Sequence, residues 1–301
     1  MKRTIFCLTV VALVAIVGSA WAGDPAFTYE IPHIPDELIP EVDGSLDDAV
    51  WAAYPMEFAW VHPGGDMPLS DGRGIGNVAP DASNFSATIK VGWNNTTNKF
   101  YMAIVEFDDA WYGDSGGGWW YDDAWHMFTD GKLYNDFFQY GDVPAEEMGA
   151  NAQHWEWFAG EHWWGRDSNM NIEQPKTNVA PSEEPFAKVE FGSVPVNGDK
   201  NVTIETEMYF SFWEFVHATD NSQSITWDLE AGQTVGWQFM RYEDDEGGDV
   251  LNAEWQTGGS YVNFNSATFA EAFLLGPGDV AWGDVPTAVE SSTWGRLKAS
   301  F

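Results

Sequence analysis

The residue types that could bind a ligand in this chain are its 18 tryptophans and its 47 aspartates and glutamates. An indole ring offers a flat apolar face. Such faces, set among polar side chains, suit sugar rings, which present C–H faces and hydroxyl rims. Most tryptophans of a folded protein fill its core, because a buried aromatic side chain removes a large apolar area from water. We therefore expect a few tryptophans to contact carbohydrate and the others to pack.

The carboxylates leave two interpretations open. The formal net charge is −34, and so acidic a chain repels nucleic acids and anionic lipids. This charge could serve solubility alone, or a salty habitat. Alternatively, some carboxylates converge on Ca²⁺, a hard cation that takes several oxygen ligands. The two interpretations are compatible.

The composition and motifs do not favour an enzyme. Pairs of carboxylates can hydrolyse glycosides, but among 47 acidic residues such pairs are too common to single one out. No H-E-x-x-H zinc motif and no phosphate-binding loop occurs. We expect a non-catalytic protein that binds an oligo- or polysaccharide, alone or beside a glycoside hydrolase. The pattern leaves its oligomeric state open.

The N-terminus predicts export. Residues 1–22 have a charged start at Lys2 and Arg3, a short apolar run, and the small residues of Ala20-Trp21-Ala22 at the cleavage position, as in a secretory signal peptide. The apolar run is too short for a comfortable membrane span. We therefore expect a secreted, periplasmic or cell-surface protein. The only cysteine, Cys7, lies in the removed segment, so the mature fold should contain no disulfide.

Three further segments are expected after the signal peptide. Residues 23–40 form an extended lead-in, residues 41–283 a single β-sandwich domain and residues 284–301 a C-terminal tail, which is either disordered or a docking or sorting signal. A long loop insertion begins at Gly131 within the domain, and a short helix includes residues 49–53.

Short stretches of alternating apolar and polar residues predict an all-β fold, an antiparallel β-sandwich of the jelly-roll or DOMON-like type with short peripheral helices. Residues 94–98 form a turn, and residues 213–216 a short turn or helix. The expected strands are residues 87–93, 99–107, 124–129, 153–158, 186–191, 201–210, 235–242 and 269–275.

Four motifs, in this order along the chain, resemble one known arrangement. They are residues 42–51, residues 89–93 with 100–105 and Asp108, residues 123–130, and residues 202–208 followed by 235–239. Together they resemble carbohydrate-binding module family 9 and the wider DOMON-like superfamily, over about residues 41 to 276. The order and spacing of all four motifs carry this resemblance, because each motif alone is common.

The resemblance implies a set of sugar-binding residues. In sugar-binding members the ligand lies between two tryptophans, which here correspond to Trp120, just ahead of Asp123, and Trp255, after the late acidic loop. Gln153 resembles a polar contact residue of the family. His126 stands where the family usually carries an acidic residue. The implied ligand is a plant-type or related glycan, held along its length or at a chain end.

The resemblance also implies a structural calcium ion. Neither of the two acidic runs has the spacing of an EF-hand loop, so their oxygen ligands would have to converge in three dimensions. The candidate ligands are Asp108, Asp109 and Asp114 in the first run and Asp244, Asp245 and Asp249 in the second.

Two alternatives to carbohydrate binding remain. Some members of the superfamily bind haem b for electron transfer, and His126, His154, His162 and Met127 are available here as axial ligands. No C-x-x-C-H attachment motif is present. The second alternative is a structural role at the cell surface or in adhesion, with the sandwich as a scaffold.

Overall fold

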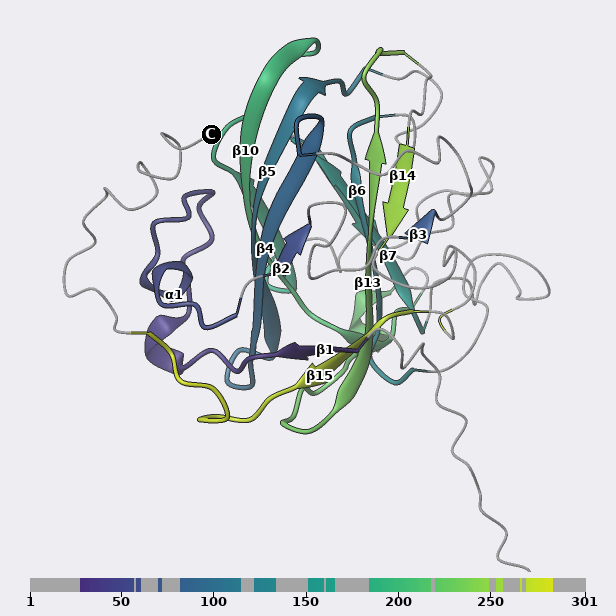
Figure 1. Ribbon diagram of the computed structural model, residues 1–301. Coiled ribbons are helices and arrows are strands. Elements are labelled where there is room, and N and C mark those ends of the chain that lie inside the picture. The colour runs from purple at the N-terminus through teal and green to yellow at the C-terminus, as the bar shows by residue number, and fades with distance from the viewer. Residues whose placement is uncertain are drawn as a thin grey trace, which may run out of the picture.

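The computed structural model describes residues 28–56, 58–60, 70–71, 82–114, 122–133, 151–159, 161–165, 184–217, 220–248, 253–256, 266 and 269–283. These residues form a sandwich of two β-sheets with very little helix (Figure 1), which confirms the predicted fold class. The predicted signal peptide, the C-terminal tail and residues 134–150 of the insertion lie outside them. No helix within the described ranges is long and apolar enough to cross a membrane.

The larger sheet has eight strands in the order β1-β15-β13-β6-β7-β8, with β14 beside β13 and β3 beside β14. The smaller has five, in the order β2-β4-β5-β10-β9, and a separate hairpin joins β11 to β12. The strands of the larger sheet are β1 (Thr28–Ile31), β3 (Ser70–Asp71), β6 (Trp125–Asp130), β7 (Gln153–Phe158), β8 (Glu161–Gly165), β13 (Thr234–Glu243), β14 (Ala253–Gln256) and β15 (Glu271–Leu274). The others are β2 (Phe58–Trp60), β4 (Phe85–Asn94), β5 (Lys99–Trp111), β9 (Ala187–Phe191), β10 (Asp199–Phe210), β11 (Trp213–Phe215) and β12 (Ile225–Thr226). The helices are α1 (Ala49–Ala52) and the 3₁₀ turns η1 (Asp36–Leu38) and η4 (Asn221–Gln223).

Alternate residues of the two sheets fill the core between them. On β6 these include Trp125 and Met127, and on β7 they include Trp155 and Trp157. The rings of Trp125 and Trp157 stack with their centroids 6.2 Å apart. Trp155 and Trp157 therefore share one face. Nine tryptophans of the described ranges are buried, so packing explains half of the 18 in the chain.

The residues of β6, β7 and β13 on the opposite face are buried as well. Successive side chains of a strand point to opposite faces, so His126, His154 and Glu156 face away from the tryptophan core. They are only 2%, 6% and 7% exposed. A smaller apolar cluster includes Phe128 and Tyr242 of the same strands. This part of the larger sheet is thus packed on both sides.

The β4–β5 hairpin is longer than predicted. Its turn lies where the sequence predicts it, but β5 continues to Trp111. Asp108 and Asp109 therefore lie within the strand and do not end it. The reason is pairing on both sides, because Asp108 is opposite Phe85 of β4 and Val202 of β10. Two neighbouring strands thus keep these polar residues extended.

Two smaller expectations need correction, and the extended lead-in gains a partner strand. Trp213–Phe215 forms β11 and not a turn or helix, because it pairs with β12. The extended lead-in contributes β1, which pairs in parallel with β15 and places Thr28 opposite Glu271. The helix predicted for residues 49–53 ends at Ala52. Pairing partners distant in the sequence decide the conformations of β11 and β1.

Candidate functional site

A buried guanidinium lies at the end of the core between the two sheets. Arg241 is on β13, two residues after the core residue Phe239, so alternation turns it inward. Its side chain is fully buried. Its Cζ atom lies 4.8 Å from the centre of the Phe85 ring and 5.8 Å from that of the Trp125 ring. Aromatic faces thus stabilise a positive charge that has left water.

Four carboxyl groups surround this guanidinium. Its Nη2 atom lies 2.9 Å from Asp108 Oδ2 and 3.6 Å from Glu243 Oε2, and its Nη1 atom lies 3.2 Å from Asp123 Oδ1. Glu106 Oε1 is 3.9 Å from Nη2, and the other oxygen of Glu106 accepts a hydrogen bond from Trp125 Nε1. All four side chains are buried. One positive charge therefore faces four acidic groups.

Burial raises the pKa of each of these carboxyl groups, because removal from water disfavours the charged form. The pKa of Asp108 rises to about 7. The pKa of Glu106 also rises, and those of Asp123 and Glu243 rise well above their ordinary values. The positive charge of Arg241 opposes the rise in every case, without cancelling it. The region therefore favours either bound protons or a further cation.

Four acidic side chains of this region could hold a metal ion. One carboxylate oxygen from each of Asp108, Asp109, Glu243 and Asp245 lies within 4.8 Å of the others; we call these residues the carboxylate cluster. The side-chain amide of Asn84 donates to Asp109 Oδ1 at 3.3 Å and to Asp245 Oδ2 at 3.0 Å. The two acidic runs of the sequence therefore do meet in space.

The other predicted metal ligands lie outside this cluster. Asp114 Oδ1 accepts a hydrogen bond from the backbone N–H of Gly248 at 2.8 Å. Asp244 Oδ1 accepts two, from the N–H groups of Glu246 and Gly247, each at 2.9 Å. Both aspartates thus hold the turn after β13, and Asp249 lies outside the described ranges.

Glu243 belongs to the cluster although the sequence motifs do not single it out. It is the last residue of β13 and begins the acidic run that follows. It is two residues from Arg241, so alternation places both on the inward face. That spacing is the signal that could have identified it.

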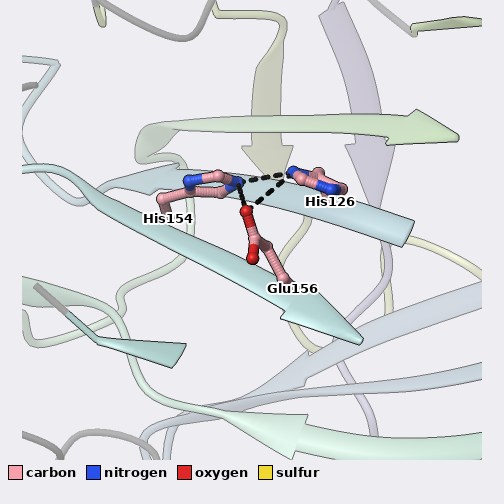
Figure 2. A group of neighbouring side chains, drawn as sticks. All are labelled: His126, His154 and Glu156. Carbon is pink, nitrogen blue, oxygen red and sulfur yellow. Dashed lines mark hydrogen bonds and ion pairs between the residues drawn. The ribbon is translucent and has the colours of Figure 1, made fainter. Parts of the chain in front are cut away.

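A second group of potential ligands lies on the opposite face of the larger sheet. His126 of β6 and His154 and Glu156 of β7, which we call the histidine cluster, point toward one another (Figure 2). His126 Nδ1 lies 2.8 Å from His154 Nε2. Glu156 Oε1 lies 3.2 Å from the first of these nitrogens and 3.3 Å from the second. Three donor atoms thus converge on one point.

Comparison with known proteins identifies the fold. No family model and no curated protein matches the chain. Among solved structures, a carbohydrate-binding module family 9 protein from Caldicellulosiruptor kristjanssonii in complex with cellotriose aligns with a TM-score of 0.51 and 13% identity, over 84% of this chain and 95% of that one. The same module in complex with glucose gives the same score and identity, with 98% of that chain covered. This chain has the fold of a family 9 carbohydrate-binding module.

Within this family 9 fold, the sugar-binding residues implied by the sequence resemblance stay predictions. Trp120 lies outside the described ranges. Trp255 is 4% exposed, and its ring stacks on that of Phe85 with centroids 5.4 Å apart. Asp123 is bound to the buried guanidinium, and Gln153 is fully buried at the start of β7. His126 belongs to the histidine cluster. The four described residues therefore pack inside the module.

The family 9 fold separates two of the residues considered as haem ligands. Met127 lies in the core between the sheets, whereas the adjacent His126 lies on the opposite face of β6. Neighbouring residues of a strand point in opposite directions, so His126 and Met127 cannot bind one iron together. The side chain of His162 lies outside the described ones.

A short sequence after β5 has the letters of a hydrolase motif. Residues 113–117 read G-D-S-G-G, which satisfies the letters of the G-x-S-x-G nucleophile turn. In α/β-hydrolases that turn joins a sheet strand to a helix and exposes the serine. Here Gly113 follows β5, whose two neighbours are both antiparallel, and Ser115 lies outside the described ranges. The family 9 module fold thus gives this motif a different setting.

Proposed function

We propose that this protein is exported and that it binds a glucan-type carbohydrate without catalysing a reaction on it. The observation that carries the proposal is the match of 84% of the chain to a module whose structure was solved with cellotriose and with glucose. The abundance of tryptophan supports it, because aromatic faces suit sugar rings.

We further propose that Trp120 makes the principal sugar contact. Its backbone is three residues from that of Asp123, and three residues span at most about 11 Å. Asp123 is fixed, since its Oδ2 accepts from the Tyr112 N–H at 2.6 Å and its own N–H donates to the Tyr112 carbonyl at 2.9 Å. The fixed end of this short span, Asp123, lies at the end of the sandwich that holds the carboxylate cluster. The buried Asp123 and Trp255 lie at this same end of the sandwich, whereas Gln153 pairs with Thr129 at the opposite end of β6.

We propose Ca²⁺ as the occupant of the carboxylate cluster. All four candidate ligands offer oxygen atoms, which hard cations prefer. The cluster also carries more acidic groups than the single guanidinium of Arg241 balances. A Ca²⁺ ion would join the end of β5 to the end of β13 and so hold the loops that follow them, including the one that carries Trp120.

Isothermal titration calorimetry with cellotriose and glucose tests the sugar site. Trp120→Ala should lower the affinity at least tenfold and leave the melting temperature nearly unchanged. Trp282→Ala is the matched control, because this half-buried tryptophan packs beside α1, away from the carboxylate cluster. An unchanged affinity in Trp120→Ala would refute the proposed contact, and the absence of binding to either sugar or to xylo-oligosaccharides would refute the proposed function.

Removal of calcium tests the ion separately. A ligand that binds only the folded state must raise its stability. EDTA should therefore lower the melting temperature and Ca²⁺ should restore it, whereas Mg²⁺ at the same concentration should restore less, because it demands a stricter octahedral geometry. A melting temperature that EDTA leaves unchanged would exclude a structural ion.

A further inference from the structure

We propose that the histidine cluster is a second metal site, which takes a borderline divalent transition metal such as Zn²⁺. It goes beyond the proposed sugar and calcium sites and uses neither. Two imidazole nitrogens and one carboxylate oxygen form its donor set. Zinc favours such sets, whereas calcium takes oxygen ligands.

Strand register brings these three residues together. His126 of β6 is directly opposite Glu156 of β7 in the antiparallel pair. His154 precedes Glu156 by two residues on the same strand, so both side chains stand on the same face. The pairing of β6 with β7 thus fixes the three backbone positions, and loop conformation plays no part.

The spacing of the donor atoms matches tetrahedral coordination. With metal–ligand bonds of about 2.0–2.1 Å, neighbouring ligand atoms of a tetrahedral zinc site are roughly 3.3 Å apart. The three distances within the cluster are 2.8, 3.2 and 3.3 Å. His126 Nδ1, His154 Nε2 and Glu156 Oε1 therefore already occupy one face of such a tetrahedron. A tetrahedral zinc ion would take one further ligand.

A hydrogen bond between His126 Nδ1 and His154 Nε2 satisfies only one side of this triangle. Each ring nitrogen carries at most one hydrogen, which points along one direction and donates best to one acceptor. A hydrogen on each of the two facing nitrogens would set like partial charges against each other at 2.8 Å. With a single hydrogen, at least one side of the triangle would join two lone pairs. A cation at the centre attracts all three atoms at once.

The surroundings hold the ligands in place. The ring of Phe128 stacks on that of His154, with centroids 4.3 Å apart and planes 14° apart. The ring of Tyr242 meets that of His126 edge-on at 4.4 Å. All three ligands are buried. Such fixed apolar walls limit the loss of side-chain freedom on binding and keep bulk water away from the metal.

Metal titration tests this proposal. The apoprotein, prepared with a chelator and without a histidine tag, is titrated with Zn²⁺ in saturating Ca²⁺, which keeps the carboxylate cluster filled. We expect one Zn²⁺ per chain and a rise in melting temperature. Co²⁺ in place of Zn²⁺ should give the intense visible absorption bands of a tetrahedral cobalt site.

Single substitutions then locate the ion. His126→Gln, His154→Gln and Glu156→Gln should each lower the Zn²⁺ affinity at least tenfold. His33→Gln is the matched control, because it removes a buried histidine elsewhere that bonds Asn95 Oδ1 at 2.8 Å. Circular dichroism establishes that each variant is folded, and if one is not, the other two decide. Wild-type affinity in the folded cluster variants, or no Zn²⁺ binding to the wild type, would overturn the proposal. Sugar affinity, measured in parallel, is independent of either outcome.

Discussion

The carboxylate cluster and the histidine cluster lie on opposite faces of the larger sheet. They differ in the property that would attract a cation. In the first, two of the four carboxylates lie beside one guanidinium, Asp108 at 2.9 Å and Glu243 at 3.6 Å from Arg241. The second brings together two imidazoles and one carboxylate, whose donor atoms are about 3 Å apart. The first is therefore defined by an excess of charge and the second by the geometry of its donors. A buried polar group can thus attract a cation in either way.

The largest effect should come from removal of the one guanidinium that the carboxylates share. Arg241→Met leaves Asp108 and Asp123 buried without their charge partner, which costs about 3–5 kcal/mol for a broken buried ion pair. Chemical denaturation measures the free energy of unfolding. Lys200→Met, at an exposed lysine, should change it by less than about 0.5 kcal/mol. Equal effects in both variants would mean that Arg241 has no special role in the carboxylate cluster.

The next largest effect should be a pH dependence of folding stability that arises from the carboxylate cluster. The folded-state pKa of Asp108 is about 7, above its ordinary value of 3.8, so the folded protein binds more protons than the unfolded one between these values. Without Ca²⁺, stability should therefore be greatest below about pH 4 and decrease as pH rises to about 7, by on the order of 3 kcal/mol. Saturating Ca²⁺ should flatten this decrease, because it binds the deprotonated carboxylates. Denaturant midpoints with EDTA and with Ca²⁺ measure both curves.

A group outside the carboxylate cluster contributes to the same pH range. Burial also raises the pKa of Glu207 to about 7, and its oxygens accept from Trp51 Nε1 at 2.7 Å and from the Asp43 N–H at 3.0 Å. It lies outside the carboxylate cluster, so its share of the decrease should persist in Ca²⁺. Glu207→Gln should remove that share. A decrease that Ca²⁺ leaves wholly unchanged would count against a metal at Asp108.

Substitution of one ligand in each cluster should weaken the binding of one metal and leave the other unchanged. Asp245→Asn removes a charged ligand from the carboxylate cluster and should lower Ca²⁺ affinity about tenfold, or roughly 1.4 kcal/mol. The Zn²⁺ affinity of the Asp245→Asn variant should not change. His154→Gln should show the reverse, with Zn²⁺ binding weakened and Ca²⁺ binding retained. Calorimetry with each ion on both variants gives four affinities, and parallel losses in both ions would show that the two sites are not separate.

The smallest effect concerns an aspartate near the carboxylate cluster. Asp114 is exposed and accepts one hydrogen bond, from Gly248 N–H. Asp114→Ala should cost about 0.5–1.5 kcal/mol of stability and leave Ca²⁺ affinity within twofold of the wild-type value. A tenfold weaker Ca²⁺ affinity would instead make Asp114 a ligand.

Alternation along the chain was enough to predict the sandwich and most of its strands. It could not show that Asp108 lies within β5, since that depends on pairing with β4 and β10. The two acidic runs were recognised, but which aspartates bind a metal and which hold turns depends on their three-dimensional convergence. Asp244 shows this, because its Oδ1 is used by backbone N–H groups.

The histidine cluster was hidden for a different reason. Its residues come from two strands separated by the insertion, and only the register that sets His126 against Glu156 brings them together. Local sequence contains no information on that register. Burial on both faces adds to the difficulty, because β6 and β7 carry large side chains at nearly every position. The usual distinction between an apolar inner face and a polar outer face does not apply there.

That double burial also fixes how β6 and β7 can align. Shifting one strand by a single residue turns every side chain to the other face. Such a shift would exchange Trp155 for His154 in the core, and would bury imidazole and carboxylate groups among tryptophans at a high desolvation cost. The polar residues of β6 and β7 therefore select one register for the pairing of these two strands. The registers shifted by one residue would be much less stable.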